Sequence, residues 1–574
     1  MRSNGHYSET VPSRLFSVDR TNLGSGRGHT AGLLTLSCCA KMVAWVWQRA
    51  RVEGGGVKLI MTHGYMLSDT GSNVYVQNLC RALVREGHNV HLLCQEPEPL
   101  SYDFVDEFVM VDADRIDKQD EQETPYSGRC VVYRPQISGL LPVYVYDEYP
   151  TWRVKSFLDL TDEELKNYLG KNIDAVRTVL EASGAESVVT NHAVPGPLIA
   201  RRALEGTDIP YTSIVHGSAL QYVARKSERY MRLTREGLER AKTIVALSSD
   251  SAGTIAEDFP DLATKTSVLP GGVDTALFRS DALDLRVLTR LNGGPGRGPD
   301  EREALNEALE ASANVVDLLG GIRKVAGSYD ARSHDRDAGE RLEGYLAADS
   351  PLVVYVGKLI HSKGVHSLLS AFARVRQKTG ARLLIVGFGT FREGLEALTH
   401  ALSTGDEKTV ERLAELGKLL EGGPAGPLEH FEVSKELLND AVGMEDGVEF
   451  IGPLRHEELA KLLPRAEVGV VSSIFPETFG LVAAEFAASG VVPFVADHSG
   501  LREAGEIVGK GLPFDLHVNM DGFEENLARA LIDYLTLPVL ERRSCSSTVR
   551  HNCVEHLSWD TLAEQLVTIT GKSG

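Results

Sequence analysis

Two glutamates, eight positions apart, are the residues of this sequence whose spacing first suggests chemistry. Glu477 and Glu485 lie in "FPETFGLVAAEFAASGVVPFV", residues 475–495, where a loop runs into an apolar, alanine-rich segment. Paired carboxylates could be the acid and base of a glycosidase, which lie about 5 to 9.5 Å apart. Eight residues of helix rise about 12 Å at about 1.5 Å each. A pair on one helix is therefore too far apart for that reaction.

The turn before the apolar segment predicts an anion site instead. Pro476 stands near the start of the expected helix, and helix N-termini bind phosphate through their free amides. The expected amides are those of Thr478, Phe479, Gly480 and Leu481. Beside that phosphate, Glu477 could accept hydrogen bonds from sugar hydroxyls, and Glu485, two turns further on, from a ribose. Two carboxylates around a helix-bound diphosphate indicate a nucleotide sugar.

The surrounding sequence predicts an α/β fold in two halves. "VKLIMTHG" reads as a buried strand, and "SDTGSNVYVQNLCRALVREGHNVHLLC" as a glycine turn, a helix and a second strand, which together make a βαβ unit. The pattern continues to residue 275 and restarts in "PLVVYVGKLIHSKGVHSLLSAFARVRQKTGARLLIVGFG". We predict doubly wound domains at residues 57–275 and 351–550. A shared ligand then belongs in the cleft at the carboxyl ends of their strands.

The remaining segments are predicted to be peripheral. Residues 1–56 read as a disordered or mis-started N-terminal tail, with a signal peptide as the alternative. A possible peripheral membrane contact is indicated there by Trp45 and Trp47 among basic residues. Residues 276–350 form a charged linker or insertion with one helix near 301–319, residues 402–445 a second insertion, and residues 551–574 a closing helix.

Composition narrows the partners and the compartment. The 574 residues carry a net charge of −20 with no concentrated basic run, which argues against a nucleic-acid partner. Seven cysteines without a CxxC spacing indicate a reducing compartment with neither disulfides nor a zinc site. No stretch reaches the roughly 18 uninterrupted apolar residues of a membrane helix. We therefore expect a cytoplasmic protein.

Four stretches, in order, resemble the family-4 retaining glycosyltransferases of the GT-B fold. From the N-terminus they are "DTGSNVYVQNLCRALVREGHNVHLL", "SVLPGGVDTALF", "GKLIHSKGVHSLLSAF" and the E-x7-E segment. The match covers nearly everything from residue 57 to about 565 except the insertions. The resemblance implies two Rossmann-like domains facing a cleft, with "LSWDTLAEQLV" as a C-terminal helix crossing back to the first domain.

The resemblance also implies roles for matching residues. Glu477 would hold donor sugar hydroxyls as a catalytic residue, Glu485 would hold the ribose, and Lys358 and Lys363 would neutralise the diphosphate. The N-terminal half would contribute His216, which lines the cleft near the transferred sugar, and a glycine loop made of Gly71, Ser72 and Asn73. His192 in "TNHAVPG" is interpreted as structural and left out of the site.

The function implied is retaining transfer of a hexose from a nucleoside-diphosphate sugar to an unidentified acceptor hydroxyl. A nucleotide-sugar epimerase and a non-catalytic nucleotide-sugar-binding protein remain alternatives. No cofactor or metal is expected, because the two lysines and the helix amides already supply positive potential at the phosphates. Neither D-x-D triplet is expected to hold a metal: residues 112–114 follow a strand-like segment far from the other motifs, and residues 335–337 lie in the charged insertion, where acidic pairs are usually solvated. Asp112→Ala and Asp335→Ala should therefore be close to neutral for turnover.

Overall fold

The computed structural model describes residues 56–571, except 69, 145–148, 150, 285, 287–289 and 313. The predicted tail and its membrane contact through Trp45 and Trp47 lie outside the described residues. Among the helices that are described, none combines the length and the apolar character needed to cross a membrane.

The N-terminal half is built on a parallel sheet whose described strands run in the order β11-β10-β9-β8-β1-β2-β5-β3-β4. Only the pairing of β3 with the edge strand β4 is antiparallel among these. The strands are β1 (Lys58–Thr62), β2 (Asn89–Leu93), β3 (Glu107–Asp112), β4 (Arg115–Glu121), β5 (Arg129–Pro135), β8 (Ser187–Asn191), β9 (Tyr211–Val215), β10 (Thr243–Ala246) and β11 (Thr266–Val268). A separate pair joins β6 (Leu140–Val143) to β7 (Arg153–Ser156).

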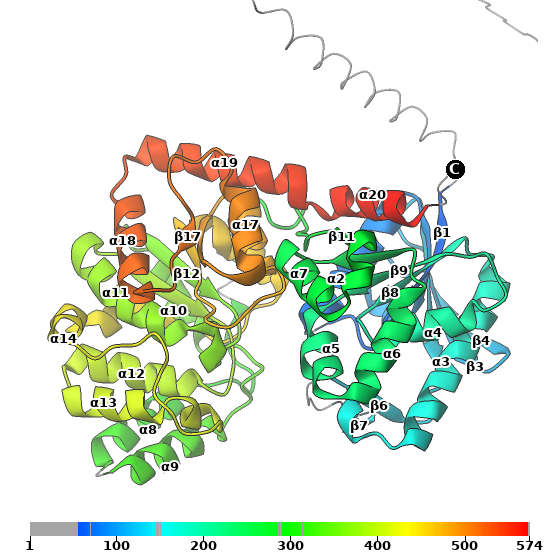
Figure 1. The fold of residues 1–574 in the computed structure, drawn as a ribbon. Coiled ribbons are helices and arrows are strands. Elements are labelled where there is room, and N and C mark those ends of the chain that lie inside the picture. The colour runs from blue at the N-terminus through cyan, green and yellow to red at the C-terminus, as the bar shows by residue number, and fades with distance from the viewer. Residues whose placement is uncertain are drawn as a thin grey trace, which may run out of the picture. The chain divides into compact units, whose positions relative to one another are not determined.

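Helices cover both faces of this sheet (Figure 1). They are α2 (Gly71–Arg85), α3 (Asp162–Ser183), α4 (Gly196–Ala203), α5 (Gly217–Tyr222), α6 (Glu228–Glu239) and α7 (Ser249–Asp258). The helix α2 buries the apolar face that its spacing predicts, through Val76, Leu79, Cys80, Leu83 and Val84. The chain then turns at Gly87, whose φ of +88° favours glycine.

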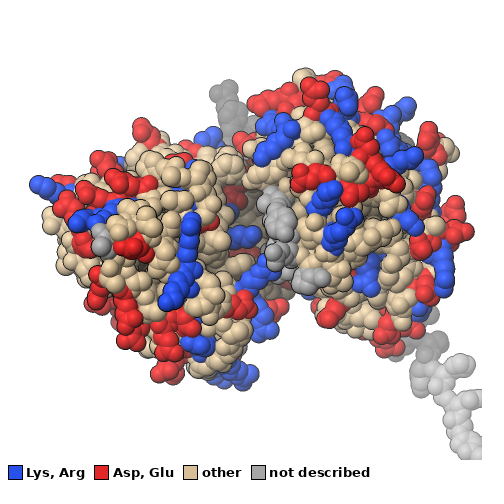
Figure 2. All heavy atoms as spheres, turned by 90° about the horizontal axis from the view of Figure 1, so that it is seen from below, with Lys and Arg blue, Asp and Glu red and all other residues tan. Residues whose placement is uncertain are grey.

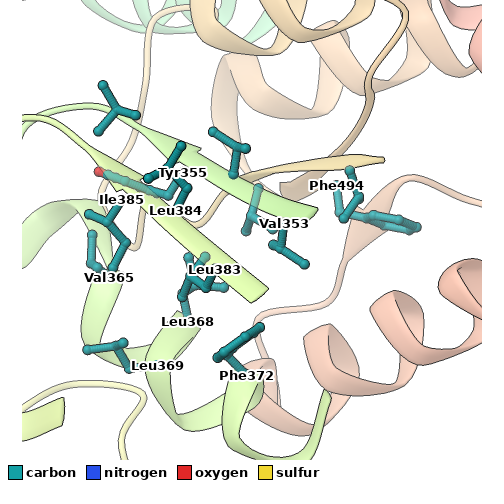
Figure 3. Close-up of a cluster of buried hydrophobic side chains, with 14 of the residues drawn as sticks. Val353, Tyr355, Val365, Leu368, Leu369, Phe372, Leu383, Leu384, Ile385 and Phe494 are labelled. Atoms are coloured by element: carbon teal, nitrogen blue, oxygen red, sulfur yellow. The ribbon is translucent and has the colours of Figure 1, made fainter. Parts of the chain in front are cut away.

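The C-terminal half repeats the design with a parallel sheet in the order β14-β13-β12-β15-β16-β17. Its strands are β12 (Leu352–Val356), β13 (Arg382–Val386), β14 (Val448–Phe450), β15 (Val468–Val471), β16 (Val492–Ala496) and β17 (His517–Val518). Its helices are α11 (Val365–Thr379), α12 (Arg392–Thr404), α13 (Glu407–Leu416), α14 (Lys435–Ala441), α15 (His456–Leu462), α16 (Leu481–Ala488), α17 (Ser499–Gly509) and α18 (Phe523–Leu535). Val365, Leu368, Leu369 and Phe372 of α11 belong to the buried core, as predicted, and Figure 3 shows Leu368 of this helix beneath the strands.

The charged segment before this half is a folded subdomain. It forms α8 (Pro299–Ala311), α9 (Val315–Ala326) and α10 (Ala338–Leu346), so the prediction of a single helix near 301–319 is wrong. Asn314 separates the first two helices, because its side chain accepts the backbone amides of Val316 and Asp317 and caps α9. The second predicted insertion contains α13 and α14.

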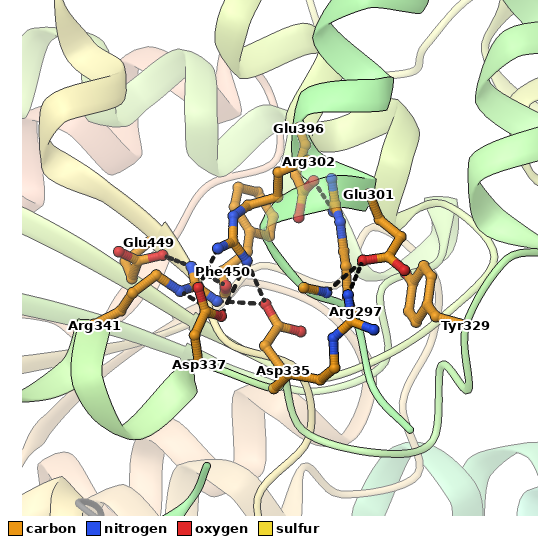
Figure 4. A network of polar contacts seen from close by, with 12 residues as sticks. Arg297, Glu301, Arg302, Tyr329, Asp335, Asp337, Arg341, Glu396, Glu449 and Phe450 are labelled. Atoms are coloured by element: carbon orange, nitrogen blue, oxygen red, sulfur yellow. Dashed lines mark hydrogen bonds and ion pairs between the residues drawn. The ribbon is translucent and has the colours of Figure 1, made fainter. Parts of the chain in front are cut away.

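A buried ion-pair network holds this insertion against the C-terminal half (Figure 4). Asp335 is 0% exposed and accepts hydrogen bonds from Arg392 of α12 at 2.7 and 2.8 Å. Arg341 of α10 pairs with the same carboxylate. The expectation that Asp335 is solvated is therefore wrong, because charged residues of this segment pair with one another and with Arg392, Glu396 and Glu449 of the C-terminal half.

Two consecutive helices end the chain, α19 (Val539–Leu557) and α20 (Trp559–Thr570), so the boundary predicted between residues 550 and 551 falls inside α19. At the junction, the amide of Val273 donates to Leu557 and the amide of Trp559 donates to Val273, at 2.8 and 3.2 Å. Trp559, Leu562 and Leu566 then join the core under α2. The closing helix thus crosses back to the N-terminal half (Figure 1).

Candidate active site

Glu477 lies in the loop that joins β15 to α16, and neighbouring groups fix its carboxylate. Lys363 forms an ion pair with Oε1, and the hydroxyl of Ser473 donates to the same oxygen at 2.5 Å. The backbone is held as well, since the Glu477 amide donates to Ser499 Oγ at 2.9 Å and its carbonyl accepts the Gly500 amide at 3.0 Å. Both side-chain donors use Oε1, so Oε2 has no hydrogen-bond partner among the described residues.

Glu477 is also kept in its ionised form. Burial by itself would raise the pKa of this carboxyl, but the charge of Lys363 and the hydrogen bonds from Lys363 and Ser473 lower the pKa below its usual value. A carboxylate that stays ionised can only accept hydrogen bonds. The side chain is therefore suited to holding hydroxyl groups.

Lys363 reaches this loop because two turns lie against each other. The carbonyl of Lys363 accepts the Ser472 hydroxyl at 2.9 Å, and the Ile474 amide donates to Ser362 at 2.9 Å. Gly364 follows at a φ of +64°, and a Cβ there would stand 2.1 Å from the Ser472 carbonyl oxygen. Only glycine permits this approach.

Lys358 lies on the same connection, after β12, but its side chain is exposed. Its carbonyl accepts the Tyr355 hydroxyl at 3.0 Å. In the described part of the chain, no carboxylate lies within 4 Å of its ammonium group. The structure thus brings Lys363 to Glu477 and leaves Lys358 as a separate, available charge.

Glu485 is buried in α16, and its partner is a residue that the sequence did not single out. His456 Nε2 lies 3.2 Å from Glu485 Oε1. The hydrogen bond that His456 donates to this carboxylate raises the pKa of His456 above its usual value; burial opposes this shift and the negative charge of Glu485 adds to it. The segment "RHEELAKLL" looks like an ordinary helix start, so no local signal marks His456 as part of a site.

The helix α16 begins later than predicted. Gly480 is its N-cap, at a φ of +97°, and Leu481 is the first helical residue. Thr478 therefore precedes the helix, and Phe479 is a buried core residue. The amides available at the helix start are those of Leu481 and the residue after it, whereas those of Thr478 and Phe479 belong to the loop. Because Glu477 also precedes the helix, the 12 Å rise assumed between the glutamates does not apply.

In the N-terminal half, Gly71, Ser72 and Asn73 form the first turn of α2, not the loop that was predicted. The side chain of Asn73 is buried, with Oδ1 2.8 Å from His63 Nε2 and Nδ2 donating to the Ser68 carbonyl at 2.6 Å. The amide group thus ties the start of the helix to the end of β1. Gly71 has open space around its missing Cβ, so packing does not require a glycine there.

His216 follows β9 and belongs to a buried cluster of imidazoles. Its Nε2 lies 2.9 Å from Asn191 Oδ1, and its ring lies 4.8 Å from that of His192, centroid to centroid. The His192 ring lies 5.5 Å from His63 in turn. Burial, and then the neighbouring His63, lowers the pKa of His216 to about 3, so its ring is neutral at pH 7. His192, which sequence analysis left out, lies beside His216, and neither of its ring nitrogens has a partner in the described structure.

The two halves meet at the loop between β15 and α16, residues 472–480, which is called the motif loop below. A Cβ on Gly217, the residue after His216, would lie 3.0 Å from Thr478 Oγ1. A Cβ on Gly271 would lie 2.5 Å from Leu481 Cδ2 and 2.9 Å from the ring of Phe479. Because Gly217 and Gly271 have no Cβ, the N-terminal half can approach the loop that carries Glu477.

The D-x-D triplets are not arranged around a common point. Asp112 is exposed and pairs with Lys171 at 2.9 Å, whereas Asp335 is buried and is bound by Arg341 of the insertion and by Arg392 of α12. Within the described ranges, no three His, Cys, Asp or Glu side chains form a group that could hold a metal ion.

Both halves match models of glycosyltransferase domains. Residues 70–272 match the glycosyl transferase 4-like domain, and residues 350–536 match glycosyl transferases group 1. The chain belongs to the GT-B glycosyltransferases. The predicted membership of the glycosyltransferases is thereby confirmed, and the two parallel sheets with their helices confirm the predicted fold class.

Individual relatives agree with this assignment. The chain is 32% identical over 179 residues to an MMP alpha-(1->4)-mannosyltransferase from Mycolicibacterium hassiacum, covering 31% of this glycosyltransferase and 40% of that protein. It spans less than half the length of the first curated relatives it matches.

Among solved structures, the fold is similar to sucrose-phosphate synthase from Thermosynechococcus elongatus, with a TM-score of 0.51, 18% identity and coverage of 89% of this chain and 98% of that one. It is also similar to HepE from Anabaena, solved in complex with UDP and glucose, with a TM-score of 0.50, 13% identity and the same coverages. These two likenesses concern the fold alone.

Proposed function

We propose that this glycosyltransferase moves a hexose from a nucleoside-diphosphate sugar to an acceptor hydroxyl, with retention of the anomeric configuration. The observation that carries the proposal is the loop carboxylate of Glu477, kept ionised by Lys363 and Ser473 with one oxygen unused. That oxygen can accept a donor sugar hydroxyl. The HepE structure, which contains UDP and glucose, supports a nucleotide-sugar donor for this fold.

The residues divide into two tasks in this proposal. Lys358, Lys363 and the first amides of α16 stabilise negative charge on the departing diphosphate, which is the main barrier-lowering interaction in such a reaction. Glu485 holds the ribose. The bond between the sugar C1 and the diphosphate oxygen breaks while the acceptor oxygen bonds to C1, and the acceptor proton passes to the departing phosphate. This scheme assigns the protein no nucleophile and no general base.

His216 serves this reaction as a hydrogen-bonding group. Because its pKa is lowered to about 3, the ring is neutral and cannot be a general acid at pH 7. With Nε2 engaged by Asn191, Nδ1 is the nitrogen left to contact the sugar or acceptor. We propose transfer without a metal, because Lys358 and Lys363 supply the positive charge that a divalent cation would otherwise provide.

The test starts with the purified protein and a thermal-shift panel of UDP-, GDP- and ADP-hexoses. The donor that raises Tm is then incubated alone, and next with acceptor alcohols, with and without EDTA. We expect slow hydrolysis of donor alone, faster turnover with an acceptor, a product with the donor's anomeric configuration by NMR, and no loss in EDTA. Formation of an isomer of the donor would indicate an epimerase, and tight binding without turnover would indicate a binding protein. Turnover that is lost in EDTA and recovered by Mn²⁺ would contradict the phosphate-site assignment.

A further inference from the structure

A cavity away from the residues assigned to transfer lies between α3, α4 and α6 of the N-terminal half. Its volume is about 410 Å³, within the range of small-molecule sites. The lining residues are Asp162, Leu165, Lys166, Leu169, Gly170, Ile173, Arg202, Arg229, Arg232 and Leu233. None of them belongs to the proposed transfer machinery.

The lining combines an apolar floor with a cationic rim. Leu165 and Leu169 of α3 form the floor with Ile173 and with Leu233 of α6. The rim carries four cations and a single carboxylate, in a chain whose net charge is −20. Figure 2 shows acidic and basic side chains interspersed over the face that it draws.

Two of the four cations are not neutralised by the protein. Arg202 pairs with Glu236 at 2.9 Å, and Arg229 pairs with Asp162 at 3.1 Å. Lys166 and Arg232 are exposed, and among the described residues neither forms an ion pair. The cavity thus offers two available positive charges above an apolar floor.

Gly170 gives a second, independent observation. It lies inside α3, where glycine costs about 0.5–1 kcal/mol relative to alanine. Packing does not explain it, because a Cβ at Gly170 would meet no atom within 4 Å, although a side chain there would occupy the cavity. Gly170 has no positive φ to require it either. The residue keeps the floor of the cavity open.

We propose that this cavity binds an anionic amphiphile: a phosphate or carboxylate held by Lys166 and Arg232, with an apolar portion on the leucine floor. The same chemistry is found in a bilayer phospholipid and in a free monomeric amphiphile. The site is independent of the proposed transfer reaction, so either can fail without the other.

The experiment measures binding of decyl phosphate, below its critical micelle concentration, to the full chain by isothermal titration calorimetry. Inorganic phosphate and decanol serve as the two half-ligands. We expect decyl phosphate to bind at least 10-fold more tightly than either. The Gly170→Leu variant, whose side chain fills the cavity, should bind decyl phosphate at least 10-fold more weakly. The double variant Lys166→Glu/Arg232→Glu should also bind it at least 10-fold more weakly.

Matched variants control for folding and for general charge. Gly170→Ala should keep binding and raise Tm, and Lys408→Glu, an exposed charge reversal on α13, should keep binding unchanged.

Sedimentation with phosphatidylglycerol vesicles, compared with phosphatidylcholine vesicles, identifies the source of the amphiphile. If the protein sediments with phosphatidylglycerol vesicles and the Gly170→Leu variant does not, the ligand is a bilayer lipid. If the wild-type protein does not sediment with these vesicles, the ligand is a free amphiphile. Absence of decyl phosphate binding, or equal binding by wild type and the folded Gly170→Leu or Lys166→Glu/Arg232→Glu variant, overturns the proposal.

Discussion

At the scale of single residues, the carboxylates of Glu477 and Glu485 are held in opposite ways. Glu477 is paired with Lys363, and a second donor, Ser473, binds the same oxygen. Glu485 is paired with His456, whose charge changes near neutrality. The two carboxylates should therefore respond differently to substitution and to pH.

Replacing Glu477 with glutamine should reduce transfer at least 100-fold, about 2.7 kcal/mol of transition-state stabilisation. The amide keeps the shape of the side chain but loses the charge that pairs with Lys363 and accepts sugar hydroxyls. Steady-state kcat/KM against the donor found in the thermal-shift panel measures the loss. Ser473→Ala, which removes one hydrogen bond to Oε1, is the milder control. Wild-type turnover in a folded Glu477→Gln protein would exclude this residue from the site.

Donor affinity should depend on the protonation of His456. The pKa of His456 is raised, so the ion pair with Glu485 is complete below the usual value of about 6.5 and is lost as pH rises through the folded-state pKa. The protonated ring competes with the ribose for Glu485, so donor binding should tighten over that rise. Calorimetric Kd values between pH 6 and 8 measure the effect. His456→Gln should bind donor with little pH dependence, and an unchanged pH profile in this variant would show that His456 is not the titrating group.

At the scale of elements, the insertion before β12 depends on charges that are buried and paired. Asp335 is fully buried and forms ion pairs with Arg392 and Arg341. Arg297 is also buried and forms an ion pair with Glu396 (Figure 4). Such pairs contribute little when intact, because desolvation offsets the attraction, but breaking one leaves an uncompensated buried charge. The network should therefore control stability without taking part in transfer.

We expect Asp335→Ala to lower the free energy of unfolding by about 3–5 kcal/mol, because Arg392 and Arg341 would lose the buried carboxylate that they share, and Arg392 would keep only Glu396 among the described carboxylates. Urea denaturation followed by circular dichroism measures the loss. Asp281→Ala, which breaks an exposed pair with Arg279, should unfold at the same urea concentration as wild type. If the two variants were equally stable, the buried network would not anchor the insertion.

At the scale of the whole molecule, the junction near residues 271–273 links the motif loop, the crossover and the last helix. Gly271 lies against Phe479 and Leu481, and Gly272 lies against Trp559 at the start of α20. Arg85 of α2 pairs with Asp560 one residue later. The contacts that position α20 on the N-terminal half thus include residues 271–273, where the chain passes from the N-terminal to the C-terminal half.

Gly272→Ala should disturb this junction, since its Cβ would stand 2.6 and 2.7 Å from ring atoms of Trp559. Overpacking of this kind costs about 1–3 kcal/mol. Tm measures the effect. Gly253→Ala in α7 is the matched control, because a Cβ there meets nothing within 4 Å, and it should be neutral or stabilising by up to about 1 kcal/mol. Equal Tm values for the two variants would contradict close packing at Gly272.

The sequence by itself determined the two α/β halves, the buried faces of α2 and α11, and the loop that carries Glu477. These features follow from local periodicity and from motifs whose residues are close in the chain. Tertiary structure decided that Lys363 bonds to Glu477, that His456 pairs with Glu485, and that Asp335 is buried. Each of these pairs joins residues at least 29 positions apart or depends on burial by another segment, and hydrogen bonds and desolvation depend on distance in space, which sequence spacing does not specify.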